Sequence, residues 1–121
     1  MAKSFRLERL NESIKELLGE MILSRIKDPR IGLVTITEVD VARDMTSAKV
    51  FFTVMGGDQE RAESREGLES AKNFLRKTIA RELKLRSAPE FRFVYDDSLD
   101  RSLEIEDTLR QLKDEDEKRE T

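Results

Sequence analysis

The 121-residue sequence contains neither cysteine nor histidine. The lack of cysteine excludes disulfide bonds and thiolate chemistry, and the lack of histidine removes the usual general base near neutral pH. Most zinc sites are excluded as well, because they draw their ligands mainly from these two residue types. The five glycines are spaced too irregularly to form a phosphate-binding or dinucleotide-binding loop. We therefore expect no enzymatic activity, no cofactor and no metal.

Long apolar runs are also missing. The opening stretch MAKSFRLERLNES lacks the apolar region of a signal peptide, and no run approaches the roughly 20 residues of a membrane span. We expect a cytoplasmic protein with no membrane partner. The length fits one domain of roughly 100 to 200 residues.

Asp96 and Asp97 are adjacent carboxylates, and a carboxylate pair can hold a metal ion or act as general acid and base. This pair is the argument for an enzyme, which would be a metal-dependent nuclease. Neighbours at the end of a strand point in opposite directions, however, so they rarely converge on one atom. The Asp-Asp-Ser sequence is more typical of a solvated turn.

Charge is unevenly distributed along the chain, whose formal net charge is -3. Eleven acids oppose five bases from Asp96 to Thr121, which leaves residues 1–95 with a net charge of +3. The final stretch KDEDEKRET has the composition of a disordered end. We therefore predict a basic domain over residues 1–98, followed at 99–121 by a C-terminal helix and an acidic, disordered tail.

Hydrophobic spacing predicts the elements of an α+β fold. Residues 4–26 show the three-and-four spacing of an amphipathic helix, with Ser4 as its N-cap and Asp28-Pro29 as its stop. Residues 32–41 and 46–55 alternate as two strands, and a third strand contains Phe91, Phe93 and Tyr95. A weaker helix follows from Leu99 to Leu112. Three short strands imply a small sheet with helices on one face.

A helical region from about Glu60 to Leu85 lies between the second and third strands. Its apolar positions, Phe74 and Leu75 among them, are expected to form a dry face, with cations on the opposite side. The stretch ESAKNFLRKTIARELKLR, residues 69–86, has six bases after Ala71 against the single acid Glu82. Cations with few interleaved acids favour contact with nucleic-acid phosphates, although a solvated helical face is the simpler alternative.

The segments 24–54 and 71–98 together resemble bacterial ribosome-binding factor A, and the similarity runs from about Arg6 to Leu112. The marks of the resemblance are short groups in a fixed order: Asp28, Pro29 and Arg30; Asp44; Phe74, Leu75 and Arg76; then Arg86, Pro89 and Glu90. It implies a KH-like domain of the order helix, strand, strand, helix, kink, helix, strand. It also implies a non-enzymatic factor that binds the free small (30S) ribosomal subunit, promotes late maturation of 16S rRNA and matters most in the cold.

Where KH domains carry a GxxG loop, the family has an interhelical kink of the form Ala, any residue, Gly. This sequence reads Ala71, Lys72, Asn73 at that place. Asn is among the few residues that readily replace Gly at positive φ. We therefore predict that the kink persists with Asn73 as its turning residue. The alternative is a continuous helix with Asn73 on its surface.

The resulting hypothesis is a monomer that binds 16S rRNA through a basic surface, without excluding contacts to ribosomal proteins or other assembly factors. An α+β protein-interaction module that contacts ribosomal proteins or translation factors is the alternative function. The predicted RNA-binding residues lie on the second helical region and at the end of the first helix: Lys72, Arg76, Lys77, Arg81, Lys84, Arg86, Arg25, Lys27 and Arg30.

Overall fold

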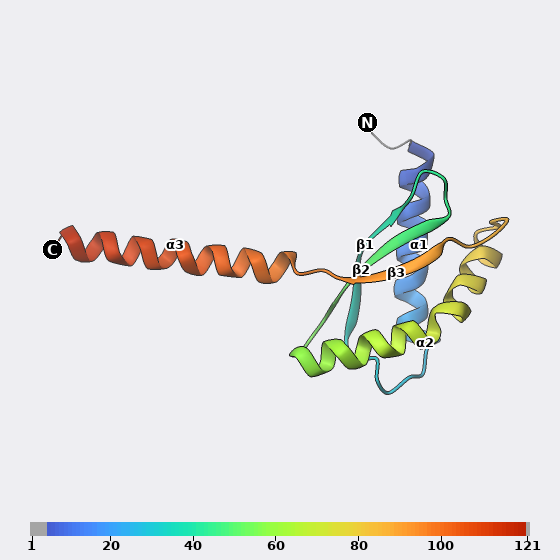
Figure 1. The fold of residues 1–121 in the computed structure, drawn as a ribbon, viewed down its shortest axis with the longest axis horizontal. Coiled ribbons are helices and arrows are strands. Elements are labelled where there is room, and N and C mark those ends of the chain that lie inside the picture. Colours follow the sequence, from blue (N-terminus) through green and yellow to red (C-terminus); the bar gives the residue numbers. More distant parts are fainter. Residues whose placement is uncertain (1–4, 121) are drawn as a thin grey trace.

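The protein forms a three-stranded sheet with three helices (Figure 1). The structure is a computed structural model that describes residues 5–120, with side chains for residues 5–114. Its elements are α1 (Phe5–Ser24), β1 (Val34–Val41), β2 (Ser47–Val54), α2 (Asp58–Glu82), β3 (Glu90–Tyr95) and α3 (Ser98–Glu120). The element order agrees with the predicted α+β class. The predicted N-cap Ser4 lies outside the described residues.

The strand order in the sheet is β1-β2-β3. β1 and β2 pair antiparallel, whereas β2 and β3 pair parallel because α2 carries the chain back across the sheet. The central strand β2 buries Ala48, Val50, Phe52 and Val54, the alternate positions that the sequence predicts. The residues between them are partly or fully exposed. One face of the sheet is therefore covered by α1 and α2, as expected.

The first helix is fixed to the sheet by burial and by one polar contact. α1 buries Leu7, Ile14, Leu18, Met21 and Ile22. The side-chain carbonyl of Asn11 accepts a hydrogen bond of 2.9 Å from the backbone N–H of Val41. The helix ends at Ser24, a few residues before Asp28-Pro29. The loop that follows is the element that carries Arg25, Lys27 and Arg30.

That loop lies against the middle of α2 at a glycine. A Cβ at Gly67 would come within 2.5 Å of Ile31 Cγ1, so the close approach of loop and helix requires glycine here. The hydroxyl of Ser64 accepts a 3.2 Å hydrogen bond from the N–H of Gly32. Together these contacts set the distance between the end of α1 and the middle of α2.

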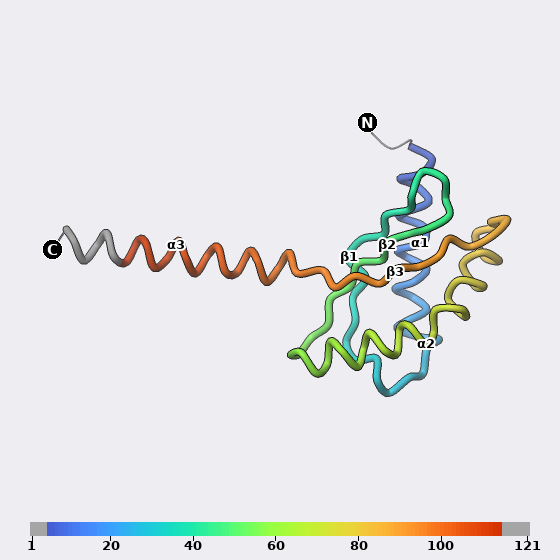
Figure 2. The backbone as a smooth tube through the Cα atoms, in the orientation of Figure 1, coloured from blue at the N-terminus to red at the C-terminus, as the bar shows by residue number. Residues whose placement is uncertain are grey.

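The last helix projects from the body of the molecule (Figure 2). α3 extends to Glu120 and so includes the part of the tail for which the composition predicted disorder. Residues with high helix propensity, such as Glu and Lys, explain a helix there. Its apolar side chains are exposed in the described part: Leu99, Leu103, Ile105, Leu109 and Leu112. None of the helices in the described residues is long and apolar enough to cross a membrane.

Carboxylates that hold loops in place, Asp28, Asp44 and Asp96, determine the acid stability that we expect, because the pKa of each is lowered. The Arg30 side chain lowers the pKa of Asp28, and the Thr37 hydroxyl, which donates a 2.6 Å hydrogen bond to Asp96, lowers the pKa of that carboxyl. A lowered folded-state pKa stabilises the protein above the unfolded value, about 3.9 for Asp, and the contribution is lost as the pH falls through the folded-state pKa.

We therefore expect the free energy of unfolding to be nearly constant from about pH 5.5 to 8, since there is no histidine to titrate, and to fall below about pH 4. Denaturant unfolding at a series of pH values measures this. Asp28→Asn should reduce the loss below pH 4. A midpoint that moves strongly between pH 6 and 8 would contradict the expectation.

Candidate nucleic-acid interface

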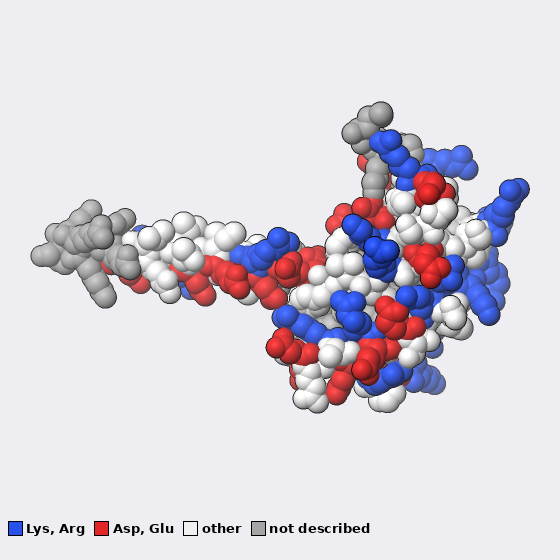
Figure 3. All heavy atoms as spheres, in the orientation of Figure 1, with Lys and Arg blue, Asp and Glu red and all other residues white. Residues whose placement is uncertain are grey.

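Positive charge gathers at the edge of the body farthest from α3, over the second half of α2 and the connection to β3 (Figure 3). The two halves of α2 differ in charge. Residues 58–69 contain five acids and two bases, whereas residues 70–82 contain four bases and one acid. The surface is therefore positive where α2 ends, in a protein whose net charge is negative.

Four of the nine predicted RNA-binding residues have partners within the protein. Arg25 pairs with Glu82 at 2.7 Å and with Glu20 at 3.1 Å. Lys72 pairs with Glu69 at 2.6 Å. Because these cations are matched by carboxylates, they add little to the net positive potential.

Arg30 and Arg76 hold the chain in place. Arg30 donates to both carboxylate oxygens of Asp28 and, at 3.0 Å, to the hydroxyl of Ser70 on α2. Arg76 donates to the carbonyls of Pro89 and Ala88 at 3.0 and 3.2 Å, and so fixes the start of β3. The structure thus gives both residues a positioning role that the sequence did not indicate.

The other five predicted residues are exposed, and none of their side chains makes a hydrogen bond or ion pair with another described residue. Lys77 and Arg81 lie one turn apart on α2, and Lys84 and Arg86 follow the helix. Lys27 lies two residues beyond Arg25, whose bond to Glu82 holds the end of α1 against the end of α2. We call these residues the cationic cluster: Lys27, Lys77, Arg81, Lys84 and Arg86.

The predicted turning role of Asn73 is wrong. Asn73 is an exposed residue inside the single helix α2, and the described non-glycine residues with positive φ are Met45 and Lys84. The physical reason is the phase of the helix. Gly67 and Leu68 before Asn73 and Leu75 and Ile79 after it are buried with one continuous 3.6-residue period, which a break at Asn73 would shift. Figure 1 nevertheless shows α2 bent near its middle, so the chain changes direction there within an unbroken helix.

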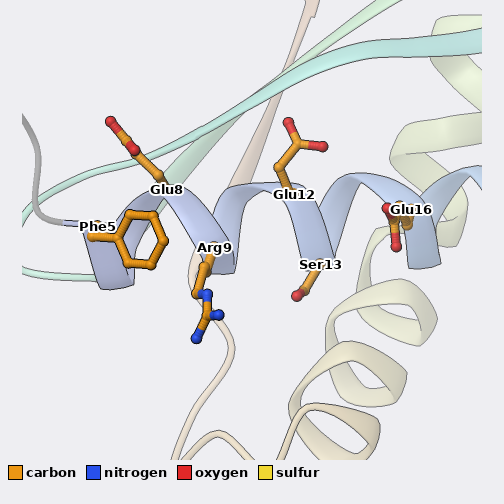
Figure 4. A pocket seen from close by; sticks show the side chains of 6 residues that line it. All are labelled: Phe5, Glu8, Arg9, Glu12, Ser13 and Glu16. Carbon is orange, nitrogen blue, oxygen red and sulfur yellow. The ribbon is translucent and has the colours of Figure 1, made fainter.

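The outer face of α1 has the opposite character. Figure 4 shows Glu8, Glu12 and Glu16 along a shallow hollow on this helix, with Arg9 beside Phe5. Three acids to one base make this face unsuited to phosphates. No group of three or more His, Cys, Asp or Glu side chains within the described residues is arranged to hold a metal ion.

A family model for ribosome-binding factor A matches residues 6–109. The chain belongs to the ribosome-binding factor A family. The ribosome-binding factor A of Halothermothrix orenii is 43% identical over 115 residues, which cover 95% of this chain and 94% of the relative.

Solved structures named for the same factor are similar in fold. The solution structure of a Thermotoga maritima protein described as ribosome-binding factor A gives a TM-score of 0.68 at 38% identity, with 78% of this chain and 90% of that chain covered. A Thermus thermophilus ribosome-binding factor A, fitted as a homology model into the map of its 30S complex, gives a TM-score of 0.59 at 23% identity, with 72% and 91% covered. The latter likeness supports the fold alone.

Within this member of the ribosome-binding factor A family, the sequence missed the exposure of Phe74. The side chain was predicted on the dry face of the helix, but 49% of it is exposed. In a helical-wheel projection at 100° per residue, Phe74 lies about 80° from the middle of the buried arc of α2. This position is at the boundary of the arc, where the projection alone does not distinguish a core residue from a surface residue. The sequence feature that pointed to an exposed Phe74 is its position one turn before the cationic residue Lys77.

Lys84 occupies an unusual backbone conformation at the end of α2. Its φ is 55°, and the N–H of Leu85 donates to the carbonyl of Ala80 at 2.8 Å, which closes the helix as a left-handed C-terminal cap. This position favours glycine, because a left-handed L-residue costs about 1 kcal/mol or more. Lysine here therefore keeps a cation at the expense of some stability.

We expect Lys84→Gly to raise the free energy of unfolding by about 0.5–1 kcal/mol, since the helix-dipole interaction of the cation offsets part of the backbone gain. Its affinity for RNA should fall. Lys84→Ala is the matched control, because it removes the charge and keeps the unfavourable φ. Thermal melts and RNA titrations separate the two effects. Equal melting temperatures for the two variants would contradict the backbone argument.

Proposed function

We propose that this protein is a cytoplasmic ribosome assembly factor that binds the free 30S subunit and promotes late maturation of 16S rRNA, above all in the cold. It acts as a monomer, by binding and without catalysis. Membership of the ribosome-binding factor A family supports this proposal. The Thermus thermophilus protein that carries the same family name has been fitted into the map of its complex with the 30S subunit. The observation that carries the RNA contact is the cationic cluster, whose five exposed cations have no described partner.

The binding mode we propose uses residues 1–98 as the RNA-binding domain. Lys77, Arg81, Lys84 and Arg86 lie along and just beyond one helix end, where they can follow a phosphate backbone. The paired residues Arg30 and Arg76 hold the loop and β3 beside this helix, so the cluster has a fixed shape. Backbone charge and RNA shape therefore dominate recognition.

Protein contact is a second candidate, favoured by one apolar feature at the opposite end of α2. Leu33, Met55 and Leu99 are exposed by 71, 75 and 64%. They border a hollow that also includes Tyr95 and Arg61. A ribosomal protein or another assembly factor with an apolar side chain could dock there.

The test of the proposed function is co-sedimentation with free 30S subunits, compared with large subunits and joined ribosomes, over a series of salt concentrations. We expect selective binding to the free small subunit. If each residue of the cationic cluster neutralises one phosphate, the slope of log affinity against log salt should be about -3.5. Equal binding to all particles would contradict the function, and a salt-independent affinity would contradict the RNA contact and favour the protein contact.

A further inference from the structure

Phe74 is the large apolar side chain of α2 that the core does not cover. Leu68, Leu75 and Ile79 on the same helix are fully buried, whereas Phe74 is 49% exposed. Its ring also makes no aromatic or cation–π contact with any described residue, although Phe5, Phe52, Phe91 and Phe93 each make at least one. About half of Phe74 is thus available to a ligand.

The exposed neighbours of Phe74 one turn away on α2 are polar or cationic. Ser70 lies one turn before it, and its hydroxyl accepts the hydrogen bond from Arg30 that is 3.0 Å long. Lys77 and Arg81, both in the cationic cluster, lie about 4.5 and 10.5 Å further along the helix axis at 1.5 Å per residue. All three are at most about 60° from Phe74 around the helix, so ring and cations share one exposed stripe.

An exposed phenyl ring within a stripe of free cations is what single-stranded nucleic acid needs. Aromatic side chains stack on unpaired bases, while neighbouring cations bind the phosphates on either side. Duplex RNA offers no such base, because its bases are already stacked and its major groove is too narrow for side chains. A protein partner would favour a wider apolar surface than one ring among cations.

We propose that Phe74 is a base-stacking site for an unpaired nucleotide, whose flanking phosphates are bound by Lys77 and Arg81. The inference rests on the proposed RNA-binding function and narrows its ligand to a single-stranded or bulged RNA segment. Phe74 supplies stacking energy and a preference for single strands that the cationic cluster alone does not provide.

The absence of tryptophan from the sequence allows a direct test by fluorescence. Phe74→Trp places a single indole at the site, and Leu103→Trp, at a residue of α3 that is 51% exposed, is the matched control. On titration with a single-stranded RNA oligonucleotide, the indole at position 74 should be quenched in step with binding, and the indole at position 103 should not. RNA binding without quenching at position 74, or equal quenching of both, would overturn the proposal.

Affinity measurements separate stacking from simple apolar contact. Phe74→Leu keeps an apolar side chain but removes the ring, and we expect it to weaken single-strand binding by about five- to a hundredfold while duplex binding is unchanged. Phe74→Tyr keeps the ring and should bind like the wild type. Circular dichroism establishes that each variant is folded.

The outcomes also distinguish this inference from the proposed function. If the wild type binds RNA and 30S subunits but Phe74→Leu binds both as tightly, the stacking site is wrong and the proposed function stands. If the wild type binds neither, the proposed function fails as well. If Phe74→Leu loses 30S binding yet keeps its affinity for naked single strands, the ring contacts a ribosomal protein, which also overturns the stacking proposal.

Discussion

Replacing Lys77, Arg81 and Arg86 together with Glu should lower the affinity for small-subunit RNA by about a hundredfold or more at moderate salt. All three side chains are exposed and unpartnered in the described chain, so the change removes three phosphate contacts and adds three repulsive charges. The salt slope should fall from about -3.5 to about -1.4, because roughly 0.7 is lost with each contact. Filter binding or anisotropy over a range of salt concentrations measures both quantities.

A variant with the same net charge controls for long-range electrostatics. Arg6→Glu, Arg110→Glu and Lys113→Glu together reverse three exposed cations that lie outside the cationic cluster, on α1 and α3. We expect at most a few-fold loss of affinity, since exposed charges beyond the Debye length are largely screened. An equal loss in both triple variants would mean that net charge alone governs binding and that the end of α2 is not the contact surface.

The sequence was sufficient for the fold because the decisive patterns are local. The alternation of Ala48, Val50, Phe52 and Val54 within β2 already defines a strand with one buried face, and the structure buries all four. The stop after the first helix and the hairpin turn are equally local. Asp44 forms that turn by accepting hydrogen bonds from the N–H and hydroxyl of Thr46.

The candidate site was only partly predictable. The charge of a segment can be counted from the sequence, but the partner of each charged side chain can lie far away along the chain. Six bases in one stretch are visible in the sequence. The pairing of Arg25 with Glu82 is not, because 57 residues separate the two along the chain. Arg76 pairs with the Glu90 carboxylate at 3.4 Å, and its two hydrogen-bond acceptors are backbone carbonyls, which no residue type reveals. Charge counting therefore located the helix end where exposed cations gather, but it also included paired residues that hold the fold in place.

The Asn73 prediction failed because residue preference was given more weight than periodicity. Asn tolerates positive φ, but tolerance does not create a break where the surrounding residues favour a helix. The buried positions keep their phase on both sides, so burying Leu75 and Ile79 against the sheet requires a continuous helical path. Packing of the apolar face is the stronger effect, since each fully buried side chain contributes about 1.5–3 kcal/mol.

Removing the ring of Phe52 should reduce the free energy of unfolding by about 3–5 kcal/mol. Phe52 is 1% exposed on the central strand, with Tyr95 edge-on at 5.7 Å and the Arg65 guanidinium 5.5 Å above its ring. Phe52→Ala would leave a cavity where β2, β3 and α2 meet. Because domains of this size are stable by about 5–15 kcal/mol, much of the total would be lost.

The adjacent Phe51 provides a matched control, since it is the same residue type on the opposite, partly exposed face of the same strand. We expect Phe51→Ala to cost about 1–2 kcal/mol in denaturant unfolding followed by circular dichroism. At a temperature where Phe52→Ala is still folded, its RNA affinity should be close to that of the wild type, because the cationic cluster lies on helix ends and loops and does not include this strand. Equal losses of stability for the two variants would mean that both faces of β2 are packed, and would contradict a sheet with helices on one face.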